Sequence, residues 1–289
     1  HPRADDPSTF AACRAGPPPR GRSSEGFCRM RGRLSRGQWR LGAVVHLFRI
    51  KICGITRPDD ARRAAEFGAD AIGLNFVDGS PRRLSRDAAC AVAAAAPSDV
   101  VRVGVFAGMS VAGMHAIAEE VGLDAIQLHG ELWPAEAFGG GLAVPTDPPQ
   151  RCGELRPLPV IRAVHLGPEG GPEPNRLEEA NRWVGAAREG GAAPAMLLVD
   201  AVVTRETAAG ARGGTGRVVD WAGLAGAHSD LPLALAGGLT PGNVAEAIAA
   251  SGAVAVDVAS GVERSPGVKD AEKMRRFIRE AAALLPPVS

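Results

Sequence analysis

The feature that most constrains this fold is a regular alternation, from Leu47 onward, of short apolar runs and alanine-rich amphipathic stretches. Such alternation is typical of βα units, in which parallel strands are covered by helices. Eight parallel strands can close on themselves, so the pattern predicts an α/β protein with a (β/α)₈ barrel of the TIM type. The eight expected strands are Leu47–Cys53, Ala71–Phe76, Val100–Phe106, Ala125–Leu128, Val160–Ala163, Ala195–Asp200, Leu233–Ala236 and Val254–Val258.

Prolines and glycines punctuate this pattern. Pro58 and Pro241 each precede an alanine-rich stretch, and proline is tolerated at the first helical position, so both are expected to begin helices. Residues 139–159 form a Gly/Pro-rich stretch longer than a usual βα connection, which predicts a surface insertion. A second such stretch, 167–174, is expected to join strand five to its helix.

Residues 1–45 differ in composition from the rest of the chain. Pro, Gly, Ser and Arg dominate, and no apolar period is sustained, so this segment cannot bury enough surface to offset its ordering entropy. We therefore expect residues 1–45 to be a disordered or misassigned extension, and residues 46–289 to form a single barrel domain. Because the chain starts at His1, an upstream extension or a targeting piece are further alternatives, and Arg20–Arg40 faintly resembles a transit peptide.

Charge and cysteine usage exclude several classes of protein. The formal net charge is +1, so no global field attracts nucleic acid or an anionic membrane. The five cysteines lack the paired spacing of a zinc site, and their odd number argues against a disulfide framework. No apolar run approaches the roughly 18 to 20 residues that span a bilayer. These features predict a cytoplasmic protein that binds a small molecule and no metal.

Two candidate catalytic residues end predicted strands. In such barrels the reactive groups lie at the C-terminal ends of the strands. Cys53 ends the first strand, and a thiol can act as a general base where a nearby cation favours the thiolate, although a buried cysteine is ordinarily a small hydrophobe. Asp200 ends the sixth, where packing does not explain a carboxylate; its alternative role is to cap the following loop.

Other polar residues fall in the neighbouring loops. Arg82 is suited to bind a substrate carboxylate with two hydrogen bonds, but the sequence does not decide whether Arg82 or Arg83 points inward. His129 is either a substrate contact or a satisfied core histidine. Asp257 ends the eighth strand, where it contacts substrate or bonds loop N–H groups.

Glycine-bearing loops follow the last two strands, LAGGLTPGN at 235–243 and DVASGVE at 257–263. Glycine allows a phosphate to approach backbone N–H groups, and barrels commonly bind phosphate after strands seven and eight. The alternative is that these glycines only make tight turns. Their occurrence as a pair favours a phosphate site.

Several ordered motifs resemble those of the phosphoribosylanthranilate isomerases. The combination of KICG, QLHG and SGVE-x-x-PG-x-KD is the most specific, and residues 1–45 and 139–159 fall outside the resemblance. The matching segments are KICGIT (51–56), GADAIGLNF (68–76), SPRRLS (80–85), VGVF (103–106), LDAIQLHG (123–130), LLVD (197–200), GGTG (213–216), DW (220–221), LAGGLTPGNV (235–244) and VDVASGVERSPGVKD (256–270).

The resemblance implies a tryptophan-pathway enzyme that converts N-(5-phosphoribosyl)anthranilate to 1-(2-carboxyphenylamino)-1-deoxyribulose 5-phosphate without metal or organic cofactor. It implies that Cys53 is the general base, that Asp200 is the general acid, with a raised pKa, and that Arg82 binds the anthranilate carboxylate. The implied phosphate loops contain Gly237, Gly238, Ser260 and Gly261. A monomer and a homodimer are both compatible with it.

Three competing hypotheses remain. An isomerase of the related histidine-pathway aminoaldose uses an aspartate where this chain has Cys53, which argues against it, although dual-substrate relatives exist. A non-catalytic phosphate binder is expected to lose Cys53 or Asp200, and both are present. A copy serving secondary metabolism is not separable from a primary one by sequence.

Overall fold

The computed structural model describes residues 39–41, 44–130, 146–166, 176–201, 221, 229 and 231–285. Within them eight parallel strands close a barrel in the order β10-β3-β4-β5-β6-β7-β8-β9, which confirms the predicted fold class. Every predicted strand is found, with ends that differ by at most three residues. The strands are β3 (Ile50–Ile52), β4 (Ala71–Asn75), β5 (Val101–Phe106), β6 (Ala125–Leu128), β7 (Val160–Leu166), β8 (Met196–Ala201), β9 (Leu233–Ala236) and β10 (Ala255–Val258).

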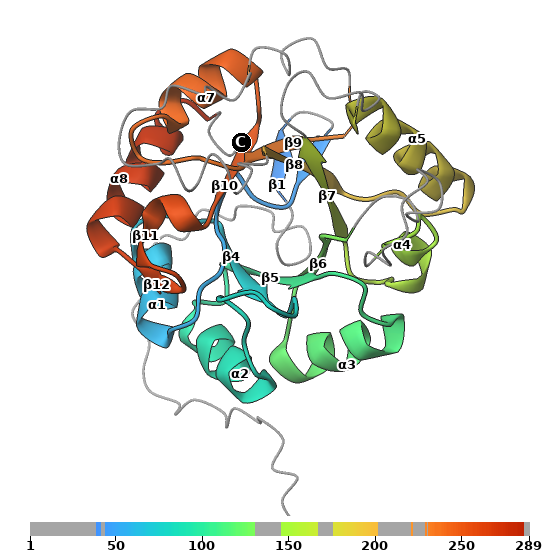
Figure 1. Ribbon diagram of the computed structural model, residues 1–289, viewed down its shortest axis with the longest axis horizontal. Helices are drawn as coiled ribbons and strands as arrows, with labels where there is room; N and C mark the ends of the chain where they lie inside the picture. Colours follow the sequence, from blue (N-terminus) through green and yellow to red (C-terminus); the bar gives the residue numbers. More distant parts are fainter. Residues whose placement is uncertain are drawn as a thin grey trace, which may run out of the picture. The chain divides into compact units, whose positions relative to one another are not determined.

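Helices surround this ring of strands on the outside (Figure 1). Pro58 is at the first position of α1, as predicted. Ser85 and Ser110 cap the N-termini of α2 and α3, because their side chains accept hydrogen bonds from backbone N–H groups in the first turns. The helices are α1 (Pro58–Glu66), α2 (Arg86–Ala95), α3 (Val111–Val121), α4 (Arg151–Glu154), α5 (Arg176–Glu189), α7 (Val244–Ser251) and α8 (Ala271–Ala282).

The expected helix start at Pro241 is wrong, because α7 begins three residues later at Val244. The side chain of Asn243 holds the intervening residues in a turn. Its oxygen accepts a hydrogen bond from the backbone N–H of Thr240 at 2.7 Å, and its nitrogen donates to the carbonyl of Gly238 at 3.0 Å. The chain therefore leaves β9 through a tight loop before the helix starts.

The end of the expected 139–159 insertion is built into the core rather than laid on the surface; residues 139–145 lie outside the described part of the chain. Asp147 is fully buried, and its carboxylate accepts a hydrogen bond from the backbone N–H of Gly130 at 2.7 Å. Cys152 and Leu155, in and beside α4, are buried as well. The stretch at 167–174 is also outside the described residues.

An antiparallel hairpin that the sequence did not suggest precedes the barrel. Its strands are β1 (Trp39–Leu41) and β2 (Val44–His46), paired from Trp39 with His46 to Leu41 with Val44. Leu47 and Phe48 follow directly and are buried among inward-facing residues of the barrel such as Val101 and Met196. The hairpin thus overlaps the last residues of the segment expected to be disordered, while residues 1–38 lie outside the described part.

Two apolar layers stabilise the barrel. One, between strands and helices, includes Ile72, Leu74 and Phe277; the other fills the interior with small and branched side chains such as Ala71, Val103 and Leu198. Alternate residues of each strand contribute to the two layers, as strand geometry requires. No helix within the described residues is long and apolar enough to cross a membrane.

Candidate active site

Both candidate catalytic residues lie at the C-terminal ends of their strands. Cys53 directly follows β3 and extends its ladder, since its N–H donates to the carbonyl of Val258 at 2.8 Å. Asp200 lies near the end of β8, two residues after the inward-facing Leu198, so strand alternation directs it inward as well. Only β9 and β10 separate their strands around the ring.

A buried polar network lies inside the barrel beneath Cys53, and the sequence analysis missed its centre, Lys51. The Lys51 side chain is 0% exposed, and its Nζ lies 2.9 Å from Oδ2 of Asp257 and donates to Oε1 of Gln127 at 3.0 Å. The Gln127 amide nitrogen donates to Nδ1 of His129 at 3.4 Å. Strand alternation could have revealed Lys51, because it shares the inner face of β3 with Cys53.

This network changes the expected role of Asp257. Its carboxylate pairs with Lys51 instead of bonding loop N–H groups, because a buried ammonium in the barrel requires a counter-charge. The other carboxylate oxygen, Oδ1, is buried and has no hydrogen-bond partner among the described residues. The charge of Asp257, together with that of Cys53, outweighs the effect of burial and raises the pKa of Lys51.

Burial raises the pKa of the Cys53 thiol, and Lys51 and Lys269 offset only part of this effect. The cations expected near the thiol are therefore present, although the effect of burial on its pKa is larger than theirs. Gly73 on β4 makes room for both side chains. A Cβ atom added there would stand 2.7 Å from Sγ of Cys53 and 3.2 Å from Cε of Lys51.

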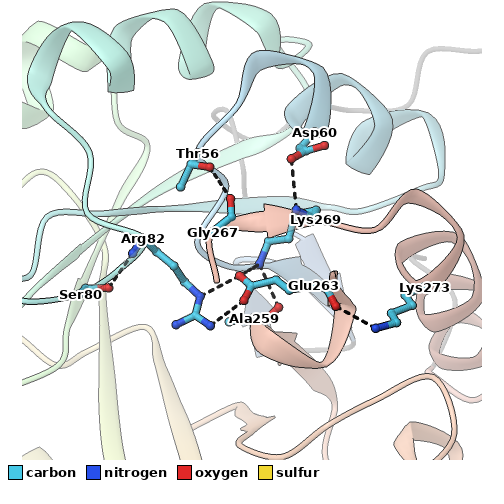
Figure 2. Close-up of polar contacts among 9 residues, drawn as sticks. All are labelled: Thr56, Asp60, Ser80, Arg82, Ala259, Glu263, Gly267, Lys269 and Lys273. Carbon is cyan, nitrogen blue, oxygen red and sulfur yellow. Dashed lines mark hydrogen bonds and ion pairs between the residues drawn. The ribbon is translucent and has the colours of Figure 1, made fainter. Parts of the chain in front are cut away.

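The structure distinguishes the two neighbouring arginines. Arg82 turns toward the segment that follows β10, where its Nε and Nη2 donate to Oε1 and Oε2 of Glu263 at 2.8 and 2.7 Å (Figure 2). Arg83 points outward, and its Nε lies 3.0 Å from the exposed carboxylate of Asp78. The stem of Arg82 packs on Gly54, next to Cys53, because a Cβ at Gly54 would stand 2.3 Å from Cδ of Arg82.

Glu263 and Lys269, which the sequence analysis also missed, belong to a short hairpin after the eighth barrel strand. This hairpin consists of β11 (Glu263–Ser265) and β12 (Val268–Lys269), and a short helix, η3 (Ser260–Val262), precedes it. Burial alone would raise the pKa of Glu263, but hydrogen bonds from Arg82 and Lys269 hold it below its usual range. The available signal was the SGVE and KD motif itself, because apolar packing does not explain its charged residues.

The two glycine loops lie against each other. A Cβ at Gly261 would stand 1.8 Å from the carbonyl oxygen of Leu239, so only glycine permits this approach. Gly237 and Gly238 have φ angles of 80° and 63°, in the left-handed region that favours glycine. Ser260 is exposed at the start of η3. The loops expected to bind phosphate therefore form one surface beside β9 and β10.

No group of three or more His, Cys, Asp or Glu side chains within the described residues is arranged to hold a metal ion. The chemistry that these residues offer is proton transfer at Cys53 and Asp200. Anion binding is available at Arg82 and at the glycine loops. This combination suits a phosphorylated, carboxylate-bearing substrate.

Comparison with known proteins identifies the family to which this chain is similar. Residues 50–139 and 176–280 match the family described as N-(5′-phosphoribosyl)anthranilate isomerase. The proteins of that name from Myxococcus xanthus and Azotobacter vinelandii are 39% and 40% identical; the alignments cover 82% and 80% of this chain and 97% and 96% of theirs.

Solved structures with the same name share the fold. That of phosphoribosyl anthranilate isomerase from Thermotoga maritima has a TM-score of 0.64 at 33% identity, and it covers 82% of this chain and 100% of its own. Another, in complex with reduced 1-(o-carboxyphenylamino)-1-deoxyribulose 5-phosphate, has a TM-score of 0.62 at 32% identity and the same coverage. This chain belongs to the N-(5′-phosphoribosyl)anthranilate isomerase family, a family of isomerases in tryptophan biosynthesis.

Proposed function

We propose that this isomerase rearranges N-(5-phosphoribosyl)anthranilate to 1-(2-carboxyphenylamino)-1-deoxyribulose 5-phosphate with Asp200 as general acid and Cys53 as general base. The observation that supports the pair is their common location. Both lie at the C-terminal ends of barrel strands, and the two strands between them lead into the glycine loops. A sugar phosphate bound there lies within reach of both side chains.

The first step is ring opening. Protonated Asp200 gives its proton to the furanose oxygen, the bond from C1 to that oxygen breaks, and the anilinic nitrogen supplies the electron pair that forms a protonated Schiff base. The oxygen leaves as the C4 hydroxyl. This step needs a carboxylic acid in its protonated form.

The second step is proton removal from C2 of the sugar. The Cys53 thiolate takes this proton. The electron pair of the broken C2–H bond forms a double bond between C1 and C2 and neutralises the Schiff base to an enaminol, which tautomerises to the ketone. Lys51 and Lys269 favour the thiolate electrostatically. Burial opposes them and raises the pKa of the thiol.

The substrate contacts follow from the anionic groups of the substrate. We assign the anthranilate carboxylate to Arg82, the phosphate to the loops with Gly237, Gly238, Ser260 and Gly261, and contacts with the sugar to His129 and Asp257. The buried, unbonded Oδ1 of Asp257 is available to accept a hydrogen bond from a hydroxyl.

The direct test is a fluorescence assay with substrate generated in situ, comparing the unmodified chain with Cys53→Ala and Asp200→Asn. Loss of one general acid or base costs about 10²- to 10⁴-fold in turnover. We expect both variants to lose activity by this amount and to keep the affinity for the reduced product analogue. An inactive unmodified chain that still binds the analogue would instead support a binding protein.

We further propose a cytoplasmic enzyme that acts as a monomer or homodimer. Cys53 and Cys152 are free thiols, which fits a reducing compartment. Light scattering of the purified chain at assay concentration would determine its mass in solution. A mass above that of a dimer would contradict this part of the proposal.

A further inference from the structure

We infer that Glu263 is the positioning residue for Arg82: it occupies one edge of the guanidinium and so directs the other edge to the carboxylate on the substrate's aromatic ring. The inference rests on the proposed function, since it takes Arg82 as the carboxylate-binding group. It adds a residue that sets the preference of this isomerase for a carboxylated ring.

The contact between the two side chains determines which edge of Arg82 remains available. Glu263 accepts from Nε and Nη2 at 2.8 and 2.7 Å, so it uses the side edge of the guanidinium. Nη1 has no hydrogen-bond partner within the described part of the chain. Each Nη carries two N–H groups, so the end formed by Nη1 and Nη2 can still bind a carboxylate with two hydrogen bonds.

Glu263 is itself held in place from the opposite side. Lys269, whose side chain is 0% exposed, donates from Nζ to Oε1 of Glu263 at 2.9 Å and to the carbonyl of Ala259 at 2.9 Å (Figure 2). Lys273 donates to the backbone carbonyl of Glu263 at 2.8 Å. Glu263 cannot move toward solvent without leaving a buried ammonium unpaired, which is strongly unfavourable.

The stem of Arg82 is fixed as well. It lies on Gly54, and its backbone N–H donates to Oγ of Ser80 at 3.2 Å. The tip of the β11–β12 hairpin is joined to the same region, because Thr56 Oγ1 donates to the carbonyl of Gly267 and a Cβ at Gly267 would stand 3.1 Å from the carbonyl oxygen of Pro81. The loops that follow β3, β4 and β10 therefore jointly fix the position of the guanidinium.

The cluster remains suited to an anion after this pairing. Two cations, Arg82 and Lys269, share the single carboxylate of Glu263, so one positive charge stays uncompensated within it. Arg82 is the more accessible of the two, with 21% of its side chain exposed against 0% for Lys269. A substrate carboxylate that approaches the loops therefore meets an oriented guanidinium.

The test measures binding of two probes: reduced 1-(o-carboxyphenylamino)-1-deoxyribulose 5-phosphate and the same compound without the ring carboxylate. Titration calorimetry compares the unmodified chain, Glu263→Gln, Arg82→Ala and the double variant. We expect Glu263→Gln to weaken the carboxylated probe about tenfold, from losing a charge-assisted contact and freeing a side chain, and the other probe less than twofold. KM should rise by a similar factor while kcat stays near its original value.

Glu272→Gln is the matched control, because this glutamate lies on α8 with 74% of its side chain exposed, and neither probe should be affected. Glu263→Asp covers the case in which the glutamine variant fails to fold. It keeps a charge for Lys269 while shortening the reach to Arg82, so the same selective loss is expected.

The outcomes separate the two levels of the argument. If Arg82→Ala binds the carboxylated probe as tightly as the unmodified chain, the assignment of Arg82 in the proposed function fails. If Arg82→Ala weakens that probe but Glu263→Gln changes neither probe, or weakens both equally, Glu263 has only a structural role and the inference is overturned. A loss at Glu263 that persists undiminished in the Arg82→Ala background would overturn it too.

Discussion

The Sγ atom of Cys53 lies against the bare Cα of Gly73 on the neighbouring strand, where an added Cβ would stand 2.7 Å from it. The same Cβ would stand 3.0 Å from the Cα of Cys53, which belongs to the barrel backbone and cannot move freely. Gly73 thus defines the space in which the thiol and the stem of Lys51 sit side by side.

We expect Gly73→Ala to displace Cys53 and to lower kcat at least about tenfold, since small displacements of a catalytic group are costly. Overpacking of this kind also lowers the free energy of unfolding by about 1–3 kcal/mol. Steady-state kinetics and urea unfolding measure the two effects. Gly185→Ala on α5 is the control, because a Cβ there meets nothing within 4 Å; equal activity in both variants would contradict the role of Gly73.

The Cys53 thiol should titrate above the ordinary range of a cysteine, because burial raises its pKa more than the lysines lower it. The difference in thiolate absorbance between the unmodified chain and Cys53→Ala, followed against pH, isolates this group. A raised folded-state pKa contributes stability that is complete below the unfolded pKa and is lost as pH rises through the folded one. As pH rises, Cys53→Ala should therefore lose less stability than the unmodified chain. A thiol titration midpoint at or below neutrality would contradict a raised pKa of Cys53.

The two arginines of the second loop should differ sharply on substitution. Arg82→Ala removes a guanidinium held by Glu263 over the strand end, whereas Arg83→Ala removes an exposed ion pair of the kind that contributes about 0–1 kcal/mol. We expect Arg82→Ala to weaken the carboxylated product analogue about tenfold or more. Arg83→Ala should stay within twofold in the same titration, and the reverse order would mean that the outward arginine binds the substrate.

The barrel was predictable because its signal is repeated along the chain. Each strand reports its own burial, as in Ala125–Leu128 and Leu233–Ala236, where predicted and observed bounds agree. Strand ends also limit where chemistry can occur, and this rule points to Cys53 and Asp200. The β1–β2 hairpin escaped prediction because three-residue strands contain too little alternation to be recognised.

The polar partners were harder to predict because they depend on tertiary contacts. Nothing local distinguishes Arg82 from Arg83; Glu263 does, and it lies 181 residues away in the sequence. Lys51 and Asp257 likewise meet only when the barrel closes between β3 and β10. The pattern of residues 139–159 predicts a surface insertion, but Asp147 is buried because its partner Gly130 follows β6 and its partner Arg162 lies on β7.

Truncation separates the two parts of the N-terminal segment. We expect removal of residues 1–38 to leave activity and thermal stability unchanged. Removal through Phe48 should destabilise the barrel by about 3–5 kcal/mol, because Phe48 is 0% exposed and fills its interior. Thermal unfolding of the two truncated chains tests this, and a large loss in the shorter truncation would show that residues 1–38 pack on the barrel.

Arg162 should be important for stability although it faces away from the barrel interior. It is 0% exposed, donates to the carbonyls of Leu128 and Gly130 at 3.1 and 2.6 Å, and lies 3.6 Å from the buried carboxylate of Asp147. Its guanidinium also lies over the ring of Trp183 at 5.2 Å. These contacts hold Gly130 and Asp147, which lie on either side of residues 131–145, against β7.

Arg162→Met should therefore lower the free energy of unfolding by about 3–5 kcal/mol, since it leaves the Asp147 carboxylate buried without this cation. Asp147 keeps Arg151 as a second ion-pair partner. Adding Asp147→Asn removes the carboxylate charge that Arg162 neutralises, so the double variant should lose less than the sum of the two single losses. Urea unfolding measures all three, with Arg62→Met, at an exposed ion pair on α1, as the control that stays within about 0.5 kcal/mol. Strictly additive losses would show that Arg162 and Asp147 stabilise the barrel independently, and that the pair does not act as one fastening.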